Sequence, residues 1–303
     1  MKKKIFILAL LLAVPVLLLA QSNRYDVKKG DWAVCATFNP VTLGYKMSCQ
    51  PAAGDFVGAY ITDMCANPKQ MFIVSQDPLA AVKVKFYTSS KSALRASLGF
   101  NGSVINYREY VQDDLAVALN PDSQNKVNDA ATSRLNTVSI SIGKEWRSGE
   151  KAIKFVYGVD LLYTIAGGDL VFNYGNKMTD INQVPSSMPM TSPKGDLDDF
   201  RSKLGIAYAR PVKRYNSGYI HGLGVQVDAG LEFFLAERIS LGLAMTFTPI
   251  MGVFQPKTYS EYEGFSTNTG RVESFNELVS PGSNALLYGT ENIGCRLTLS
   301  YYL

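Results

Sequence analysis

The charged side chains best placed to interact with one another lie on the polar faces of segments whose opposite faces are apolar. Acids and bases that share one face of a sheet can form ion pairs. If the face is enclosed they must do so, because an unpaired buried charge is costly. We therefore expect a network of charges inside the fold. It comprises Lys83, Lys85, Arg95, Glu145, Lys154, Asp160, Asp228, Glu232 and Arg296.

Residues for other kinds of chemistry are few. The chain has one His, which argues against a His-centred catalytic or metal site, and no set of nucleophile, base and orienting group stands out. We expect no cofactor, no metal and no enzyme activity. Of the four Cys, Cys49 and Cys65 share one predicted loop and are a possible disulfide, whereas Cys35 and Cys295 are explained equally well as free thiols.

The first twenty residues have the pattern of a secretory signal peptide. Three Lys precede the apolar run Ile5–Leu19, and the small residue Ala20 follows it. We expect 1–20 to be the signal peptide, with an uncleaved anchor as the alternative, and 21–303 to be one β-barrel domain. No later run approaches the roughly 20 apolar residues of a membrane helix. After the signal peptide, only strands could cross a bilayer.

Eight segments alternate between apolar and polar residues with the period of a β-strand. Short and long connections alternate between them if the piece Phe200–Arg210 belongs to the third long connection, as a hairpin extension. The pattern predicts an all-β, antiparallel, up-and-down transmembrane β-barrel of eight strands, with ten as the alternative, short periplasmic turns and long extracellular loops. The segments are Trp32–Phe38, Val82–Tyr87, Leu94–Asn101, Thr137–Trp146, Lys154–Thr164, Gly222–Phe233, Ile239–Phe247 and Ile293–Leu303.

Aromatic residues on the apolar faces separate this fold from a soluble barrel. In the predicted topology they fall at two heights, as in the aromatic girdles of membrane barrels. Phe155 and Tyr163 mark the two heights on one strand and lie about 26 Å apart along it. The turn-side set is Trp32, Phe86, Trp146, Phe155, Phe233 and Tyr301, and the loop-side set is Phe38, Phe100, Tyr163 and Phe247.

The motifs GDWAV at 30–34, ALRASLGF at 93–100 and GLEFFLAERISLG at 230–242 give the chain a recognisable layout. It resembles small outer-membrane β-barrel proteins of the OmpA/OmpX kind and, more closely, the porin-like barrel family of Bacteroidota. The resemblance implies a location in the cell outer membrane, contact with outer-membrane lipid, and recognition of the C-terminal strand by the barrel-assembly machinery. The net charge of +4 comes from dispersed Lys and Arg, so we expect no nucleic-acid partner.

Eight strands enclose an interior that side chains just fill. We therefore expect the lumen charges to close the barrel, and the protein to have a structural or surface-interaction role through loops that bind an unknown extracellular ligand or partner. The alternative is a small porin for ions or small solutes. Glu145 and Lys154 flank a predicted turn at Arg147–Lys151 and are expected to be neighbours. Asp228 and Glu232 are expected to face Arg95, Lys85 and Arg296.

Overall fold

The structure is a computed structural model that describes residues 27–40, 80–149, 152–187, 205–290 and 293–303. The predicted signal peptide at 1–20 and the possible Cys49–Cys65 disulfide lie outside these residues. The described residues form twelve strands and one short helix, α5, and no helix among them is long and apolar enough to cross a bilayer. The elements are β1 (Trp32–Phe38), β2 (Ala80–Ser89), β3 (Ser92–Gln112), α5 (Asp114–Leu119), β4 (Lys126–Ser148), β5 (Ile153–Asn173), β6 (Ile206–Asn216), β7 (Ile220–Ala236), β8 (Ile239–Gln255), β9 (Thr258–Ser266), β10 (Arg271–Ser280), β11 (Ser283–Tyr288) and β12 (Ile293–Tyr302).

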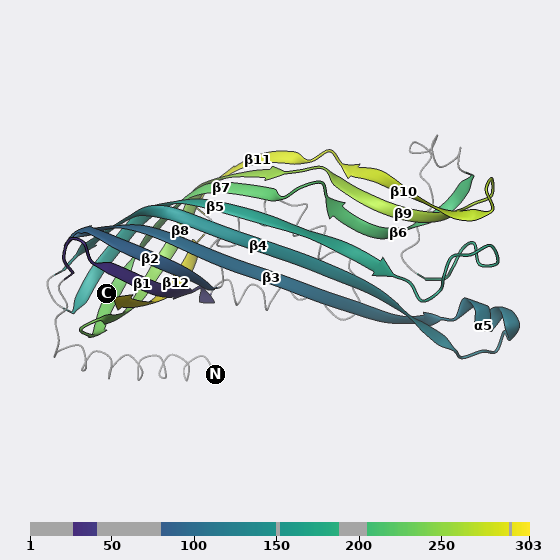
Figure 1. Cartoon of the computed structure of the whole chain (residues 1–303), viewed down its shortest axis with the longest axis horizontal. Helices are drawn as coiled ribbons and strands as arrows, with labels where there is room; N and C mark the ends of the chain where they lie inside the picture. Colours follow the sequence, from purple (N-terminus) through teal and green to yellow (C-terminus); the bar gives the residue numbers. More distant parts are fainter. Residues whose placement is uncertain (1–26, 41–79, 150–151, 188–204, 291–292) are drawn as a thin grey trace.

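Eight of these strands close into an antiparallel ring in the order β1, β2, β3, β4, β5, β7, β8, β12 and back to β1. The closing pair joins the first and last strands, with Val34 opposite Tyr301 and Phe38 opposite Leu297. Figure 1 shows the tilted strands of this barrel at the end of the molecule where the C-terminus lies. The predictions of an all-β antiparallel barrel and of its closure by the terminal strand are confirmed.

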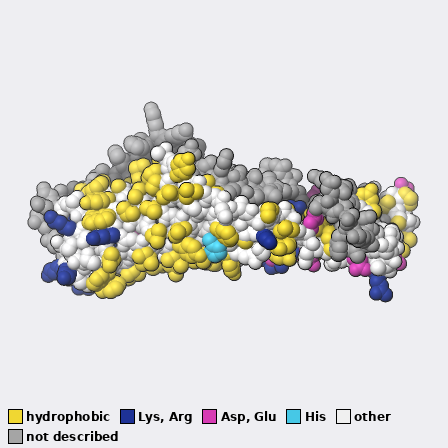
Figure 2. All heavy atoms as spheres, turned by 90° about the horizontal axis from the view of Figure 1, so that it is seen from above, with side chains coloured by type: hydrophobic (Ala, Val, Ile, Leu, Met, Phe, Trp, Pro, Cys, Tyr) yellow, Lys and Arg dark blue, Asp and Glu magenta, His cyan; other side chains and the backbone are white. Residues whose placement is uncertain are grey.

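Alternation decides which side chains enter the barrel. On β1, Ala33, Cys35 and Thr37 are buried inside, whereas Trp32 and Val34 are exposed on the outside. The same alternation holds along β5 and β12. Figure 2 shows the result as a broad cover of hydrophobic side chains over the barrel end of the molecule. The inside of the barrel is therefore the polar side.

Beyond the barrel the chain forms a sheet of six strands, which we call the extension. β3, β4 and β5 run on unbroken, and β6, β9 and β10 complete it in the order β3, β4, β5, β6, β9, β10. At about 3.3 Å per residue, the 23 residues of β4 cover about 75 Å, roughly three times a 25 Å membrane band before tilt is considered. Figure 1 shows the extension reaching away from the barrel to α5.

The extension corrects two predictions of the sequence. Residues 103–134 and 255–287 lie in two of the long connections that the sequence predicts to be loops, but Val104 pairs with Arg134 and the ladder continues to Gln112 opposite Lys126. Both faces of these segments carry polar residues, so apolar and polar residues do not alternate clearly in the sequence. The strands continue in the register that is set in the barrel. The described part of the piece Phe200–Arg210 lies in β6, outside the ring, as a strand of the extension.

The interruptions between barrel strands and extension strands occur where the backbone cannot continue a ladder. Pro256 separates β8 from β9, and Pro281 followed by Gly282 separates β10 from β11. Proline has no N–H to donate. Gly282 has a φ of +88°, a conformation that L side chains rarely adopt. β9 pairs with β6, and β11 pairs with β8. The chain therefore stays in the same sheet on both sides of each break.

Candidate functional site

The charged residues singled out from the sequence all lie inside the barrel. They come from six strands of the ring, and each is less than 10% exposed. The strands position them by alternation alone, because the intervening residues face outward. The nine residues are Lys83 and Lys85 on β2, Arg95 on β3, Glu145 on β4, Lys154 and Asp160 on β5, Asp228 and Glu232 on β7, and Arg296 on β12.

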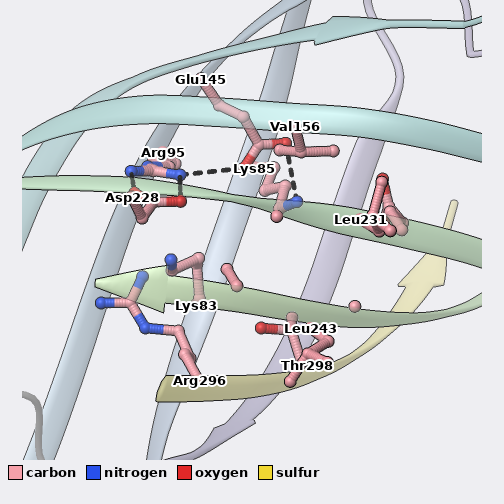
Figure 3. Close-up of a pocket in the computed structure, with 14 residues that line it drawn as sticks. Lys83, Lys85, Arg95, Glu145, Val156, Asp228, Leu231, Leu243, Arg296 and Thr298 are labelled. Atoms are coloured by element: carbon pink, nitrogen blue, oxygen red, sulfur yellow. Dashed lines mark hydrogen bonds and ion pairs between the residues drawn. The ribbon is translucent and has the colours of Figure 1, made fainter. Parts of the chain in front are cut away.

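Arg95 is the centre of this interior layer. Its Nε and Nη2 atoms donate to the two carboxylate oxygens of Asp160 at 2.7 and 2.9 Å. Its Nη1 atom donates to Glu145 and to Asp228 at 3.1 Å each, and Nη2 also pairs with Asp228. A planar guanidinium with five N–H donors is the group that can bind several carboxylates at once. Arg95 thereby ties together β3, β4, β5 and β7 across the lumen. Figure 3 shows its pairs with Glu145 and Asp228.

Gly158 leaves the space that the Arg95 guanidinium occupies, because it has no side chain. A Cβ atom at this position of β5 would lie 2.5 to 2.7 Å from Nη2, Cζ and Nη1 of Arg95. Because the guanidinium is already held by three carboxylates, it could not move aside without losing some of them. An alanine at 158 would therefore force the guanidinium to shift and would weaken the ion network.

Glu145 is shared between two cations, Arg95 and Lys85, whose Nζ atom donates to it at 2.7 Å. The expected contact with Lys154 is wrong. In the β4–β5 ladder Glu145 lies opposite Gly158, and Lys154 donates to the carbonyl of Gly149 at 2.9 Å. The hairpin turn begins later than the sequence suggested, because β4 continues to Ser148, and this moves Lys154 down to the turn.

Arg147 also belongs to the interior ion pairs, although the sequence predicts it in the turn. It is buried on β4 and pairs through Nη2 with Glu232. Tyr302 donates to the same carboxylate at 2.5 Å and Ser240 does so at 2.6 Å. The signal was present in the sequence, since Arg147 continues the inward positions set by Glu145.

Aromatic rings surround the Arg147 guanidinium and close the turn end of the barrel. Its Cζ atom lies 5.1 Å from the ring centre of Tyr87, 5.6 Å from Phe234 and 5.9 Å from Tyr302. A guanidinium is attracted to aromatic faces, and the attraction is larger where water is excluded. The rings pack with Val27, Ala33, Cys35 and Ala93 in one buried cluster, so this end is filled.

Above the ion pairs, toward the extension, the interior holds a second group of residues. Arg296 donates to Gln226 at 2.8 Å. Farther out, Ala166, Ile220, Met251 and Val253 form an apolar cluster across β5, β7 and β8. A cavity of about 30 Å³ lies among the charges, room for one or two water molecules. In the described residues the barrel interior is therefore packed by three successive layers of aromatic, charged and apolar side chains.

The aromatic residues assigned to girdles lie on the outer face of the ring. Trp32 and Phe86 face each other on neighbouring strands with ring centres 4.8 Å apart, and Trp146 stacks on Tyr157 at 5.7 Å. Tyr163 bonds His221 through its hydroxyl at 2.8 Å. Each of the ten is exposed or partly exposed: Trp32, Phe38, Phe86, Phe100, Trp146, Phe155, Tyr163, Phe233, Phe247 and Tyr301.

The extension has a buried cation of its own, Arg210 on β6. Its Nε atom donates to Glu263 at 2.7 Å, Nη1 donates to the carbonyl of Asn176 at 2.9 Å, and Cζ lies 4.1 Å above the ring of Tyr174. Burial raises the pKa of the Tyr174 phenol above its ordinary value, so it remains a donor to the carbonyl of Pro211. This cluster joins the segment after β5 to β6 and β9.

Among the described residues, no group of three or more His, Cys, Asp or Glu is arranged to hold a metal ion. Cys35 and Cys295 are free, with Cys35 inside the barrel and Cys295 on its outer side. The interior is thus a site of ion pairs and packing.

The sequence matches no protein-family model and no curated protein. Among solved structures, the chain is similar to the outer membrane protein OprG from Pseudomonas aeruginosa, with a TM-score of 0.31 and 10% identity, covering 91% of this chain and 97% of that one. It is also similar to the outer membrane protein AlkL, solved in DMPC lipid bilayers, with a TM-score of 0.31 and 11% identity over 94% of each chain. At these scores neither likeness bears on function.

Proposed function

We propose that the protein is an integral outer-membrane β-barrel with a closed interior, and that it acts as a structural or surface-interaction protein through its extension. The observation that carries the proposal is the inverted polarity of the ring. Ion pairs are buried inside, while large apolar side chains such as Leu98 and Met245 are more than half exposed outside. Water-soluble monomers rarely expose apolar patches larger than a few hundred Å². A lipid environment accounts for both faces at once.

Closure of the interior supports a role other than conduction. The Arg147 layer with its three aromatic rings fills one end, and the Arg95 layer joins four strands across the middle. The cavity of about 30 Å³ between the charges is smaller than any hydrated solute would need. A buried charge separated from its partner is costly, so the Arg95 layer resists opening.

The extension supplies the surface for an interaction. In the part of the chain that the structure describes, β3 beyond Gly99 pairs only with β4, and β10 pairs only with β9, so two sheet edges are available. Exposed backbone edges are templates for an added strand. Val104 and Tyr110 on β3 are largely exposed beside the first edge. An extracellular ligand or partner that adds a strand there is consistent with this arrangement.

The proposal also covers the partners in assembly, the kinship with other barrels and the lack of enzyme activity. Outer-membrane lipid and the barrel-assembly machinery, acting on β12, are the partners that it requires during assembly. The finer kinship with OmpA/OmpX-like or Bacteroidota barrels is part of the proposal, as is the lack of enzyme activity. A screen of the refolded protein against ester and peptide substrates tests the last of these, and turnover by the purified barrel would contradict it.

Planar-bilayer conductance of the refolded protein tests closure directly. We expect no steady openings over the range of voltages at which a reference porin in the same bilayer conducts. Electrophoretic mobility before and after heating verifies that the sample is folded. Steady single-channel openings from folded protein would overturn the closed barrel and favour the small porin for ions or small solutes.

A further inference from the structure

A hollow lies on the outer face of the barrel, over β7, β8 and β12. Its volume is about 400 Å³, against about 30 Å³ for the cavity among the lumen charges. Five apolar side chains line it: Val227 and Ala229 on β7, Met245 and Phe247 on β8, and Ile293 on β12. Met245 is 64% exposed and Ile293 is 50% exposed, so the hollow opens to the surroundings of the ring and not to the lumen.

Irregular pairing on both edges of β8 accounts for the hollow. On the edge that meets β7, the register shifts between Phe247 and Ile250. On the other edge, β8 pairs with β12 up to Phe247 and with β11 from Ile250. Pro249 lies within both interruptions, and proline has no N–H to donate to a ladder. Ala229, opposite Met245, adds space because its side chain is small.

The residues that line the hollow offer almost no polar group to an occupant. Asp228 and Thr246 border it, but both side chains are buried in the barrel interior, where Asp228 binds Arg95. Among the described residues that line the hollow, Thr290 is the remaining polar one, and none is Lys or Arg. These residues therefore suit a hydrocarbon chain, and they provide no cation for an anionic headgroup.

The hollow is continuous with the apolar outer face of the ring, where Leu231 and Leu243 beside it are also exposed. In a bilayer the hydrophobic effect does not favour one apolar partner over another, because lipid chains are as apolar as the protein. A concave surface nevertheless gives a chain contact atoms on several sides, and these dispersion contacts are lost if the space stays empty. A chain in the hollow is therefore held more firmly than one on the flat outer face.

We propose that one acyl chain of a zwitterionic phospholipid binds in this hollow on the outside of the barrel. Thr290 marks the end of the hollow toward the extension, and Met245 and Ala229 lie at the end toward the middle of the ring. The headgroup lies beside Thr290, and the chain runs down past Phe247 to Met245. This inference rests on the proposed outer-membrane barrel and adds a specific lipid site to it.

Native mass spectrometry of the folded protein tests the site. The protein is refolded into phosphatidylcholine vesicles and extracted in a mild detergent, and the lipid that remains bound is counted. We expect one retained phospholipid in the wild type, because chains on the rest of the outer face exchange with detergent. Ala229→Trp fills the hollow and should lose this lipid. Ala96→Trp, at an exposed alanine on β3, should keep it.

Methyl NMR gives a second readout that needs no variant at the hollow. The protein carries ¹³C-methyl Met and is studied in deuterated detergent with protonated phosphatidylcholine. We expect a nuclear Overhauser effect between the Met245 methyl group and the acyl-chain protons, with Met245→Leu used to assign the signal. If Ala229→Trp does not refold, the absence of this effect in the wild type overturns the proposal.

The remaining outcomes separate the possible occupants. Equal lipid retention in the wild type and Ala229→Trp, or no retained lipid in the wild type, overturns the site but leaves the inserted barrel standing. When the vesicles also contain lipid A, its preferential retention overturns the zwitterionic occupant. A dimer that Ala229→Trp abolishes overturns the lipid and assigns the hollow to a second copy of the chain. Failure of the folded protein to enter vesicles contradicts the proposed outer-membrane barrel itself.

Discussion

The barrel and the extension are built from the same strands but hold their buried cations in different ways. Arg95 in the barrel is bound by three carboxylates, and Arg147 by a carboxylate and three rings. Arg210 in the extension has one carboxylate, one backbone carbonyl and one ring. If the barrel lies in lipid, as we propose, it must balance its charges from within, whereas water would reach an extension outside the membrane. We therefore expect the barrel to need its charge network in order to fold, whereas loss of an ion pair in the extension should affect only the extension.

The largest expected effect follows from removing the Arg95 cation. Arg95→Met leaves Asp160 and Asp228 buried without their cation, which costs about 3–5 kcal/mol. We expect little or no folded barrel, measured as the heat-sensitive fast-migrating band after refolding in detergent. The control is Arg134→Met, whose 3.9 Å contact with Asp169 is half exposed. It should change stability by less than about 0.5 kcal/mol. Equal refolding of the two variants would contradict an essential network.

Two exposed positions on β3 test whether the membrane ends between the barrel and the extension. Leu98→Arg places a charge on the outer face of the ring, where it costs about 2–4 kcal/mol if that face meets lipid. Tyr110→Arg places the same charge on the extension part of the strand, where Tyr110 is 75% exposed, and should be tolerated. Insertion into lipid vesicles, followed by urea titration, measures both. If Leu98→Arg inserts as well as Tyr110→Arg, the outer face of the ring does not face lipid.

A third comparison uses glycines. Gly158→Ala forces a Cβ atom to within 2.5 Å of the Arg95 guanidinium, whereas Gly252→Ala on β8 meets only the carbonyl of Leu223 at 3.8 Å, an ordinary contact. Overpacking of this kind costs about 1–3 kcal/mol. We expect a lower urea midpoint for Gly158→Ala and an unchanged midpoint for Gly252→Ala. The opposite order would mean that Arg95 is not held in place by its carboxylates.

The same contrast explains what could be predicted from the sequence. Alternation between lipid-facing and lumen-facing residues is strong in the barrel, so the eight strands, their order and the inward side of each charge follow from it. The ion-pair partners of those charges cannot be predicted from the alternation, because they depend on the register across several strands. Glu145 meets Lys85 rather than Lys154, since β4 runs on to Ser148 before the turn. The extension strands were missed because both of their faces are polar in sequence.

Arg210→Ala should loosen the extension while leaving the barrel intact. The substitution removes the ion pair with Glu263, the bond to the carbonyl of Asn176 and the contact with the Tyr174 ring, which together join three segments of the extension. We expect faster proteolysis within 174–187 and β6, with an unchanged barrel melting temperature. Loss of the folded barrel in this variant would show that the extension and the barrel unfold as one unit.

The smallest effect is expected at the tip of the extension, where Asp114 begins α5. Its carboxylate is partly desolvated, but donors from Ser186 and Asn182 outweigh this and lower its pKa below the usual 3.8. A carboxylate with a lowered pKa contributes stability above its unfolded-state pKa and loses it as pH falls through the folded-state value. The protection of amides around Ser186, expressed as the exchange rate relative to the intrinsic rate at the same pH, should therefore be high at pH 6 and lower below about pH 4. In Asp114→Asn this protection should be low at both pH values, and in Asp122→Asn, on the exposed turn nearby, it should be as in the wild type. Because water surrounds the tip, the melting temperature of the barrel should not change in either variant, in contrast to every substitution that disturbs the lumen.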